Sequence, residues 1–162
     1  MNVQIQDSIH YLPSIGLLKF DSSLDSIITP RNSKVYLTLF SSRVQAGFPS
    51  PADDYAEKSL DLNEHLISHP AATFFVRVSG DSMIGAGIHN DDILVVDRSL
   101  KAKHNSIVIA VLNGELTVKR LKIYPDKCVL APENPAYKNI VITPEMDFTV
   151  WGVVTSVVHQ FI

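Results

Sequence analysis

The stretch "SIVIAVLNGELTVKRLKI", residues 106–123, decides the fold class of this chain. Asn113-Gly114 separates two apolar runs, and both central positions of a tight type I′ turn need positive φ, which Asn and Gly adopt most easily. The stretch therefore predicts a β-hairpin with a two-residue loop. That loop fixes the register, which pairs Leu112 with Glu115, Ala110 with Thr117 and Val108 with Lys119.

Further strand-like segments follow one another from residue 73 to the C-terminus. They are rich in Val, Ile, Phe and Thr, and turn residues separate them. The expected strands lie within residues 73–78, 91–97, 106–123, 127–132, 139–143 and 148–161. Short strands at this spacing favour antiparallel pairing over strands that alternate with helices. The fold class is therefore expected to be mainly β, with a compact antiparallel core.

The N-terminal part of the chain has a different character and suggests three regions. Residues 1–46 are expected to form an extended arm, residues 47–72 a linker with one short helix, and residues 73–162 the β-rich core. The helix is expected in "SLDLNEHLISHP", where Asp61 is suited to cap the start and Pro70 to stop the end.

Composition excludes several classes of function. Apolar residues make up 46% of the 162 residues and the net charge is −3, with no basic stripe of the kind that binds nucleic acid. The one cysteine, Cys128, rules out an intrachain disulfide and fits a reducing cytoplasm. Neither a cofactor motif nor metal-ligand spacing is present, so no cofactor and no metal are expected. Membrane association is not expected either, because no apolar run approaches the roughly 18 residues that a spanning helix needs.

Two residues raise the question of catalysis, and each has two interpretations. Ser82 follows Gly80-Asp81 after a strand, so it is either a structural turn residue or a hydroxyl presented for nucleophilic attack. Lys119 is either a surface lysine or an amine covered by its apolar neighbours Val108 and Ala110. Burial would disfavour the ammonium and lower the lysine pKa, and a neutral lysine can activate a serine as its general base.

The order and spacing of several motifs resemble a known family. "SGDSMIGAGIHNDDILVVDRS" and the later "GELTVKRL" resemble the Ser-Lys peptidase domain shared by LexA repressors and UmuD mutagenesis proteins, with UmuD as the closer match. The resemblance extends over residues 44–158 and includes "VQAGFPSPADDY". It implies self-cleavage, with Ser82 as the nucleophile, Lys119 as the general base and the bond between Ala46 and Gly47 as the substrate.

The same resemblance implies partners and a trigger. A RecA filament is expected to stimulate cleavage, and backbone N–H groups near Asp81 and Ser82 are expected to stabilise the oxyanion. The cleaved form is expected to be a cytoplasmic homodimer that associates with a UmuC-like Y-family DNA polymerase in translesion synthesis. Direct sequence-specific DNA binding is not expected. Without the resemblance, the residues of "VQAGFPSP" alone favour a flexible linker over a cleavage segment.

Three alternatives compete with this interpretation. A LexA-like self-cleaving repressor needs a helix-turn-helix before the cut, and residues 1–45 are short and interrupted by Pro13, Gly16 and Pro30. A signal-peptidase-like protease needs a membrane anchor. A Ser-His-Asp triad would draw on scattered histidines, namely His10, His65, His69, His89, His104 and His159.

Overall fold

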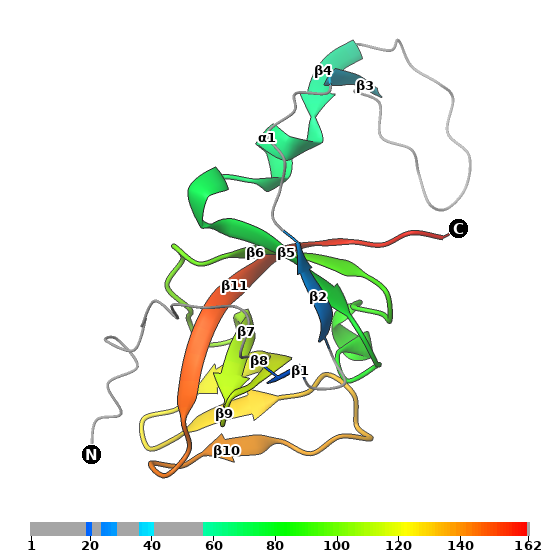
Figure 1. Cartoon of the computed structure of the whole chain (residues 1–162). Helices are drawn as coiled ribbons and strands as arrows, with labels where there is room; N and C mark the ends of the chain where they lie inside the picture. Colours follow the sequence, from blue (N-terminus) through cyan, green and yellow to red (C-terminus); the bar gives the residue numbers. More distant parts are fainter. Residues whose placement is uncertain (1–18, 21–23, 29–35, 41–56, 162) are drawn as a thin grey trace. The chain divides into compact units, whose positions relative to one another are not determined.

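A computed structural model of the chain describes residues 19–20, 24–28, 36–40 and 57–161 (Figure 1). The chain divides into two compact units, one formed by residues 1–30 and 69–162 and the other by residues 31–68. In the second unit, β3 (Tyr36–Phe40) pairs antiparallel with β4 (Glu57–Asp61), and α1 (Leu62–Leu66) follows directly.

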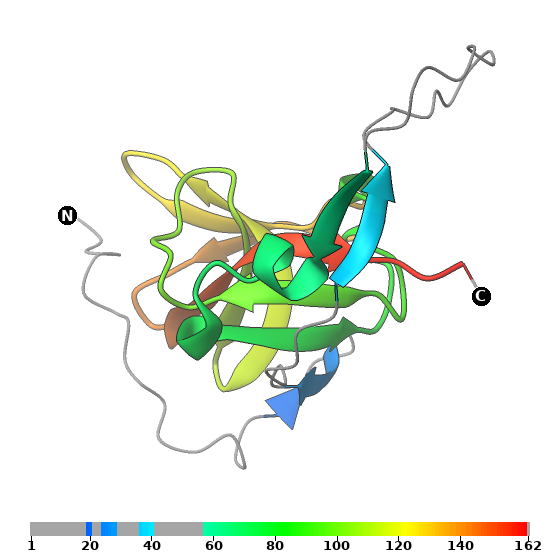
Figure 2. The ribbon, with the colours of Figure 1, turned by 90° about the horizontal axis from the view of Figure 1, so that it is seen from above.

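The first unit is built around one large sheet. Its strand order is β10-β9-β8-β7-β11-β6-β5-β2, every neighbouring pair in this order is antiparallel, and β1 adds a short parallel pairing to β8. The strands are β1 (Lys19–Phe20), β2 (Leu24–Ile28), β5 (Thr73–Val78), β6 (Ile93–Asp97), β7 (Ile107–Leu112), β8 (Glu115–Ile123), β9 (Cys128–Ala131), β10 (Ile140–Ile142) and β11 (Phe148–Val158). Figures 1 and 2 show β5 and β6 side by side in this sheet. The expected mainly antiparallel β fold is confirmed.

β11 joins the two halves of the sheet because it bends. Its first half pairs with β7 and its second half with β6, and the register shifts between Val150 and Gly152 and again between Val154 and Ser156. Such shifts are typical of β-bulges, which bend a strand and increase its twist. Gly152 is needed at the bend, because a Cβ there would lie 2.6 Å from a methyl carbon of Val96. Figure 1 shows the resulting long curved strand.

The hairpin between β7 and β8 forms as the sequence predicts. Asn113 and Gly114 have φ values of +50° and +83°, which are those of a type I′ turn. The predicted register is confirmed, with Leu112 opposite Glu115, Ala110 opposite Thr117 and Val108 opposite Lys119. The loop before β11 also stabilises this turn, because the Asn113 backbone N–H donates to the Asp147 carbonyl at 2.7 Å.

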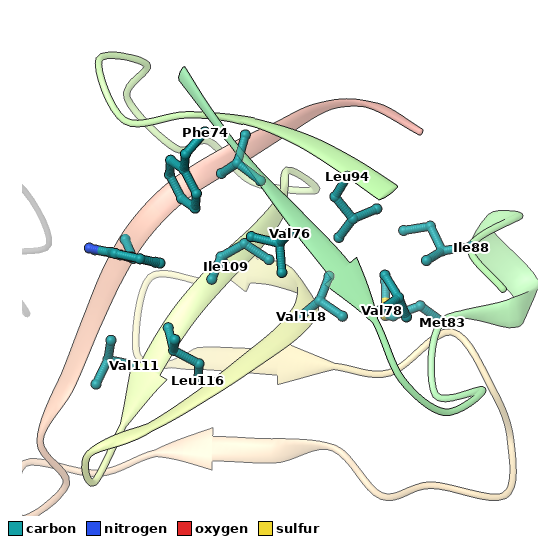
Figure 3. Packing of buried hydrophobic residues seen from close by; sticks show 12 residues of the cluster. Phe74, Val76, Val78, Met83, Ile88, Leu94, Ile109, Val111, Leu116 and Val118 are labelled. Atoms are coloured by element: carbon teal, nitrogen blue, oxygen red, sulfur yellow. The ribbon is translucent and has the colours of Figure 1, made fainter. Parts of the chain in front are cut away.

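Apolar side chains cover both faces of this hairpin. On one face, Leu116 and Val118 belong to a core cluster with residues of β5, β6 and β11, shown in Figure 3. On the other face, Val108 and Ala110 pack in a second cluster with Leu121 and residues of β9. Burial on both faces makes β8 a nearly continuous buried strand rather than an alternating one. Lys119 therefore sits on a covered face of the sheet.

The short helix α1 is confirmed, and so is its cap. Asp61 adopts an extended conformation and its Oδ1 accepts a hydrogen bond from the Asn63 backbone N–H at 2.8 Å. The helix ends at Leu66, earlier than the proline was expected to stop it, and Pro70 instead begins a 3-10 turn over Pro70–Ala72. Among the described residues, no helix has the length and apolar character needed to cross a membrane.

Candidate active site

Ser82 lies in a turn that begins where β5 ends. The chain reverses at Gly80, whose φ is +87° and whose backbone N–H donates to the Asn90 side chain at 2.8 Å. A hydrogen bond from the Ile84 N–H to the Asp81 carbonyl, at 3.1 Å, closes the turn before the 3-10 segment Ile84–Ala86. The turn places Ser82 in the interior, and only 7% of its surface is exposed.

A distant segment of the chain holds this turn in place. The Glu133 N–H donates to the Ser82 carbonyl at 2.9 Å, and the Gly85 N–H donates to the Glu133 carbonyl at 2.7 Å. The approach is so close that a Cβ on Gly85 would lie 2.4 Å from that carbonyl oxygen. Arg120 on β8 forms an ion pair with the Glu133 side chain, which ties the same segment to the strand that carries Lys119.

Asp81 makes further contacts with this segment. The Tyr137 hydroxyl donates to Asp81 Oδ1 at 2.5 Å, and the Asn134 amide donates to the Asp81 carbonyl at 3.1 Å. The hydrogen bond to Asp81 and its negative charge both oppose ionisation of the phenol, so the pKa of Tyr137 is raised above its ordinary value. Among the described residues, none accepts a hydrogen bond from the backbone N–H of Asp81 or Ser82.

The Lys119 side chain reaches Ser82 from β8. Its Nζ lies 3.1 Å from Ser82 Oγ, 2.9 Å from Thr117 Oγ1 and 2.9 Å from the Val118 carbonyl oxygen. Lys119 is only 7% exposed. The structure thus brings together two candidate residues that are 37 positions apart in the sequence.

A pocket of about 260 Å³ opens next to this pair. Leu112 and Ile140 provide apolar surface, whereas Glu115 and Lys138 bring charged groups to its lining. The other lining residues come from the serine turn, from β8 and from the 137–140 segment: Ser79, Gly80, Asp81, Ser82, Thr117, Lys119 and Tyr137. A partly apolar pocket can hold a peptide. At such a pocket, the Ser82 hydroxyl can attack a peptide carbonyl, and the Lys119 amine can accept and return the proton.

Other sequence candidates fall elsewhere. Ala46 and Gly47 lie outside the described residues, as does His10. The best Ser-His-Asp set has the wrong order of contacts, because His69 Nδ1 and Ser99 Oγ both bond to Asp97, at 2.6 Å each. Burial raises the pKa of Asp97, but the hydrogen bonds from Ser99 and His69 outweigh it and lower that pKa overall. In a catalytic triad the histidine must contact the serine.

Sequence reasoning missed the residues that support the pair. The hairpin register placed Thr117 opposite Ala110 but gave it no role, and Glu133 and Tyr137 were not singled out. The alternation of β8 could have indicated Thr117, because positions two apart on a strand point to the same side. No local pattern indicates Glu133, since its contact with the serine turn depends on how distant loops meet.

Comparisons with known proteins assign the class. Residues 38–155 match the peptidase S24-like family, so the β fold and the pocket belong to a peptidase domain. The chain belongs to the peptidase S24-like family. It is 53% identical to the protein ImpA of Escherichia coli over 75% of this chain and 83% of the relative. It is 48% identical to SamA of Salmonella typhimurium over 83% of this chain and 94% of the relative. It is 49% identical to MucA of Escherichia coli over 70% of this chain and 77% of the relative.

These relatives are UmuD-like SOS mutagenesis proteins, so the resemblance expected from the sequence is confirmed. They support a role in SOS mutagenesis, and the family supports a self-cleaving peptidase. The matched range includes the Ala46-Gly47 peptide.

Proposed function

We propose that this protein is a UmuD-like serine peptidase of the SOS response that cuts its own chain between Ala46 and Gly47. One observation carries the proposal: Lys119 Nζ lies 3.1 Å from Ser82 Oγ, and both residues are buried beside a pocket. A distance in the hydrogen-bond range is what proton transfer between a nucleophile and its base requires.

The neighbours of Lys119 suit a neutral amine. The Val118 carbonyl can only accept a hydrogen bond, and the Thr117 hydroxyl can accept another, so these two contacts use both N–H groups of an –NH₂. In that state the nitrogen lone pair can accept the proton of the Ser82 hydroxyl, whose oxygen lies 3.1 Å away. Burial favours this protonation state, because a charged ammonium loses its hydration there.

The proposed reaction has two halves. Ser82 Oγ attacks the Ala46 carbonyl carbon while its proton passes to Lys119, and the carbon–nitrogen bond to Gly47 breaks as the new amine takes that proton. Water then attacks the ester carbon while Lys119 takes a proton from the water. The bond from that carbon to Ser82 Oγ breaks, Lys119 passes the proton to Oγ, and the new carboxyl end of residues 1–46 is released. The N–H groups of Asp81 and Ser82, which have no acceptor among the described residues, are suited to stabilise the oxyanion.

The sequence around the proposed cut suits a bound peptide. Ala46 and Gly47 have almost no side chain, so their backbone can approach a buried hydroxyl closely. Val44 and Phe48 flank them and are suited to the apolar part of the pocket. Because the bond belongs to the same chain or to its dimer partner, high effective concentration replaces substrate affinity.

Regulation and partners complete the proposal. A RecA filament on single-stranded DNA stimulates the cut by favouring docking of the cleavage segment. The product, residues 47–162, forms a homodimer in the cytoplasm and associates with a UmuC-like Y-family polymerase in translesion synthesis. This part of the proposal rests on the resemblance to UmuD, and the UmuD-like relatives match this chain over most of their own length.

The test uses purified full-length protein incubated with RecA, single-stranded DNA and a non-hydrolysable nucleotide. At neutral pH, mass spectrometry should detect fragments 1–46 and 47–162 much sooner when the filament is complete than when one component is missing. Omission of DNA is the control for stimulation, and Ser82→Ala is the control for chemistry. No cleavage, or cleavage at another bond, would contradict the proposal. A specific band shift of operator DNA by the intact protein would favour the LexA-like repressor instead.

A further inference from the structure

Three metal-ligating side chains meet in the first unit, apart from the serine and the lysine. His89 and Asp92 come from the loop between the serine turn and β6, and His159 follows the end of β11. One potential ligand atom from each residue lies within 4.8 Å of the other two. The two histidine rings also lie next to each other, tilted by 53° and with centroids 5.0 Å apart. The proposed peptidase chemistry does not use any of these side chains.

Asp92 is the fixed centre of this cluster. It is 2% exposed, and its Oδ2 accepts a hydrogen bond from the His89 backbone N–H at 2.7 Å, which fixes the orientation of the carboxylate. Its Oδ1 lies 2.5 Å from His159 Nδ1, and its Oδ2 lies 3.7 Å from His89 Nδ1. A buried carboxylate is costly to desolvate unless cations or donors compensate for it. Here two partly exposed imidazoles converge on it from the solvent side.

We propose that His89, Asp92 and His159 bind a divalent transition metal ion of the zinc type. Two imidazole nitrogens and one carboxylate oxygen are a ligand set that Zn²⁺ accepts, with water at the fourth position. Ligand atoms around tetrahedral zinc are about 3.3 Å apart, given bonds of about 2.0–2.1 Å. The contact between Asp92 and His159 therefore has to widen by about 0.8 Å, which the partly exposed His159 ring can provide by rotation. The backbone N–H that holds Asp92 would act as an outer-shell support.

The position of the cluster indicates what a bound ion would do. The Asp92 carbonyl accepts a hydrogen bond from the Val78 N–H at 2.8 Å, and the Asn90 side chain accepts one from the Gly80 N–H at 2.8 Å. The loop with His89 and Asp92 thus supports the start of the turn that carries Ser82. An ion shared with His159 joins this loop to the chain after β11, and so stabilises one side of the turn.

The test measures binding of Zn²⁺ alone to untagged full-length protein by isothermal titration calorimetry. The parent chain carries Ser82→Ala, so that self-cleavage cannot alter the sample and the result does not depend on the proposed function. His159→Ala and His89→Ala each remove one proposed ligand from a partly exposed position. His104→Ala is the matched control, because His104 is an exposed histidine that bonds to the backbone of Ile123 instead.

We expect one ion to bind per parent chain, unchanged binding in His104→Ala, and at least tenfold weaker binding in both ligand variants. Co²⁺ should show the intense visible absorption of a tetrahedral site in the parent, and both ligand variants should lose it. Absence of binding to the folded parent would overturn the proposal. Equal binding in the ligand variants, or an equal loss in His104→Ala, would overturn it as well. Circular dichroism of each variant checks that it is folded.

Discussion

Two turns in this molecule differ in what holds them. The Asn113-Gly114 turn closes a hairpin between adjacent strands, and its positive φ values are those that its own two residues favour. The turn that contains Ser82 instead bonds to Glu133, Asn134 and Tyr137, about fifty residues away. The first turn follows from its own two residues, with an added contact to Asp147, whereas the position of the second depends on tertiary contacts.

The difference matters for the proposed chemistry. A nucleophile has to be held within a fraction of an ångström of its working position, and residues packed around it provide that rigidity. The hairpin sets where Lys119 lies along β8, and the long-range contacts set where Ser82 lies relative to it. Changes at the two turns should therefore have different consequences.

The largest effect is expected from Gly85→Ala. The new Cβ would lie 2.4 Å from the Glu133 carbonyl oxygen, so the serine turn and the 133 segment must move apart. We expect a loss of about 1–3 kcal/mol in the free energy of unfolding. Self-cleavage should fall by at least a hundredfold, since displacement of about 1 Å has that effect on oriented groups. Urea unfolding and a cleavage time course measure both.

Gly87→Ala is the matched control for that change. Gly87 has a φ of +74°, but a Cβ there would meet nothing within 4 Å. The substitution should cost roughly 1 kcal/mol of stability through backbone strain alone, with cleavage largely retained. If both variants lost cleavage equally, the contact with Glu133 would not be what positions Ser82.

A smaller effect is expected from Thr117→Val, which keeps the shape of the side chain and removes its hydroxyl. Lys119 then loses a hydrogen-bond partner at 2.9 Å. Such a bond contributes about 1 kcal/mol, so cleavage should slow by about five- to tenfold. Thr117→Ser should restore most of the rate, because it returns the hydroxyl. An unchanged rate in folded Thr117→Val protein would show that this contact does not orient the amine.

Gly114→Ala tests the locally specified turn. Gly114 has a φ of +83° and open space around it, so an added methyl group introduces backbone strain without a clash. We expect a loss of about 1 kcal/mol in the free energy of unfolding, measured by urea denaturation. The cleavage rate of the folded protein should stay within about twofold. If folded Gly114→Ala protein lost most of its cleavage, the exact geometry of the hairpin turn, and not only the strand register, would position Lys119.

Among the contacts of the serine turn, the smallest effect is expected from Tyr137→Phe. The hydroxyl bonds to Asp81 in an exposed position, so its removal should slow cleavage only a few-fold. The pKa of this tyrosine lies above the ordinary value of about 10, because Asp81 opposes its ionisation. A spectroscopic titration should therefore lose a tyrosine that ionises above the ordinary pKa in Tyr137→Phe. If the tyrosine that disappears from the titration has a pKa at or below the ordinary value, the contact with Asp81 is contradicted.

Sequence reasoning reached the parts of the fold that rest on local patterns. The strand segments, the hairpin register and the Asp61 cap follow from alternation, turn chemistry and capping, and all are confirmed. The early end of α1 and the bends of β11 were not anticipated, because helix ends and bulges depend on packing.

The candidate site divides in the same way. The hairpin register placed Lys119 beside Val108, and the resemblance named Ser82 as its partner. No sequence pattern predicts the contact between Glu133 and the serine turn, because this contact forms only when the loop before β10 packs on that turn. The cluster of His89, Asp92 and His159 was missed because His159 lies 67 residues from Asp92 in the chain.

The central claim is that a neutral Lys119 takes the proton from Ser82. The most direct measurement is the rate of self-cleavage of the purified protein against pH, without RecA, for wild type, Ser82→Ala and Lys119→Ala. In wild type, fragments that break between Ala46 and Gly47 should form faster as pH rises, because more of the amine is neutral. Neither variant should cleave at any pH. A flat rate from neutral to alkaline pH in folded wild type, or cleavage by Lys119→Ala, would contradict the claim.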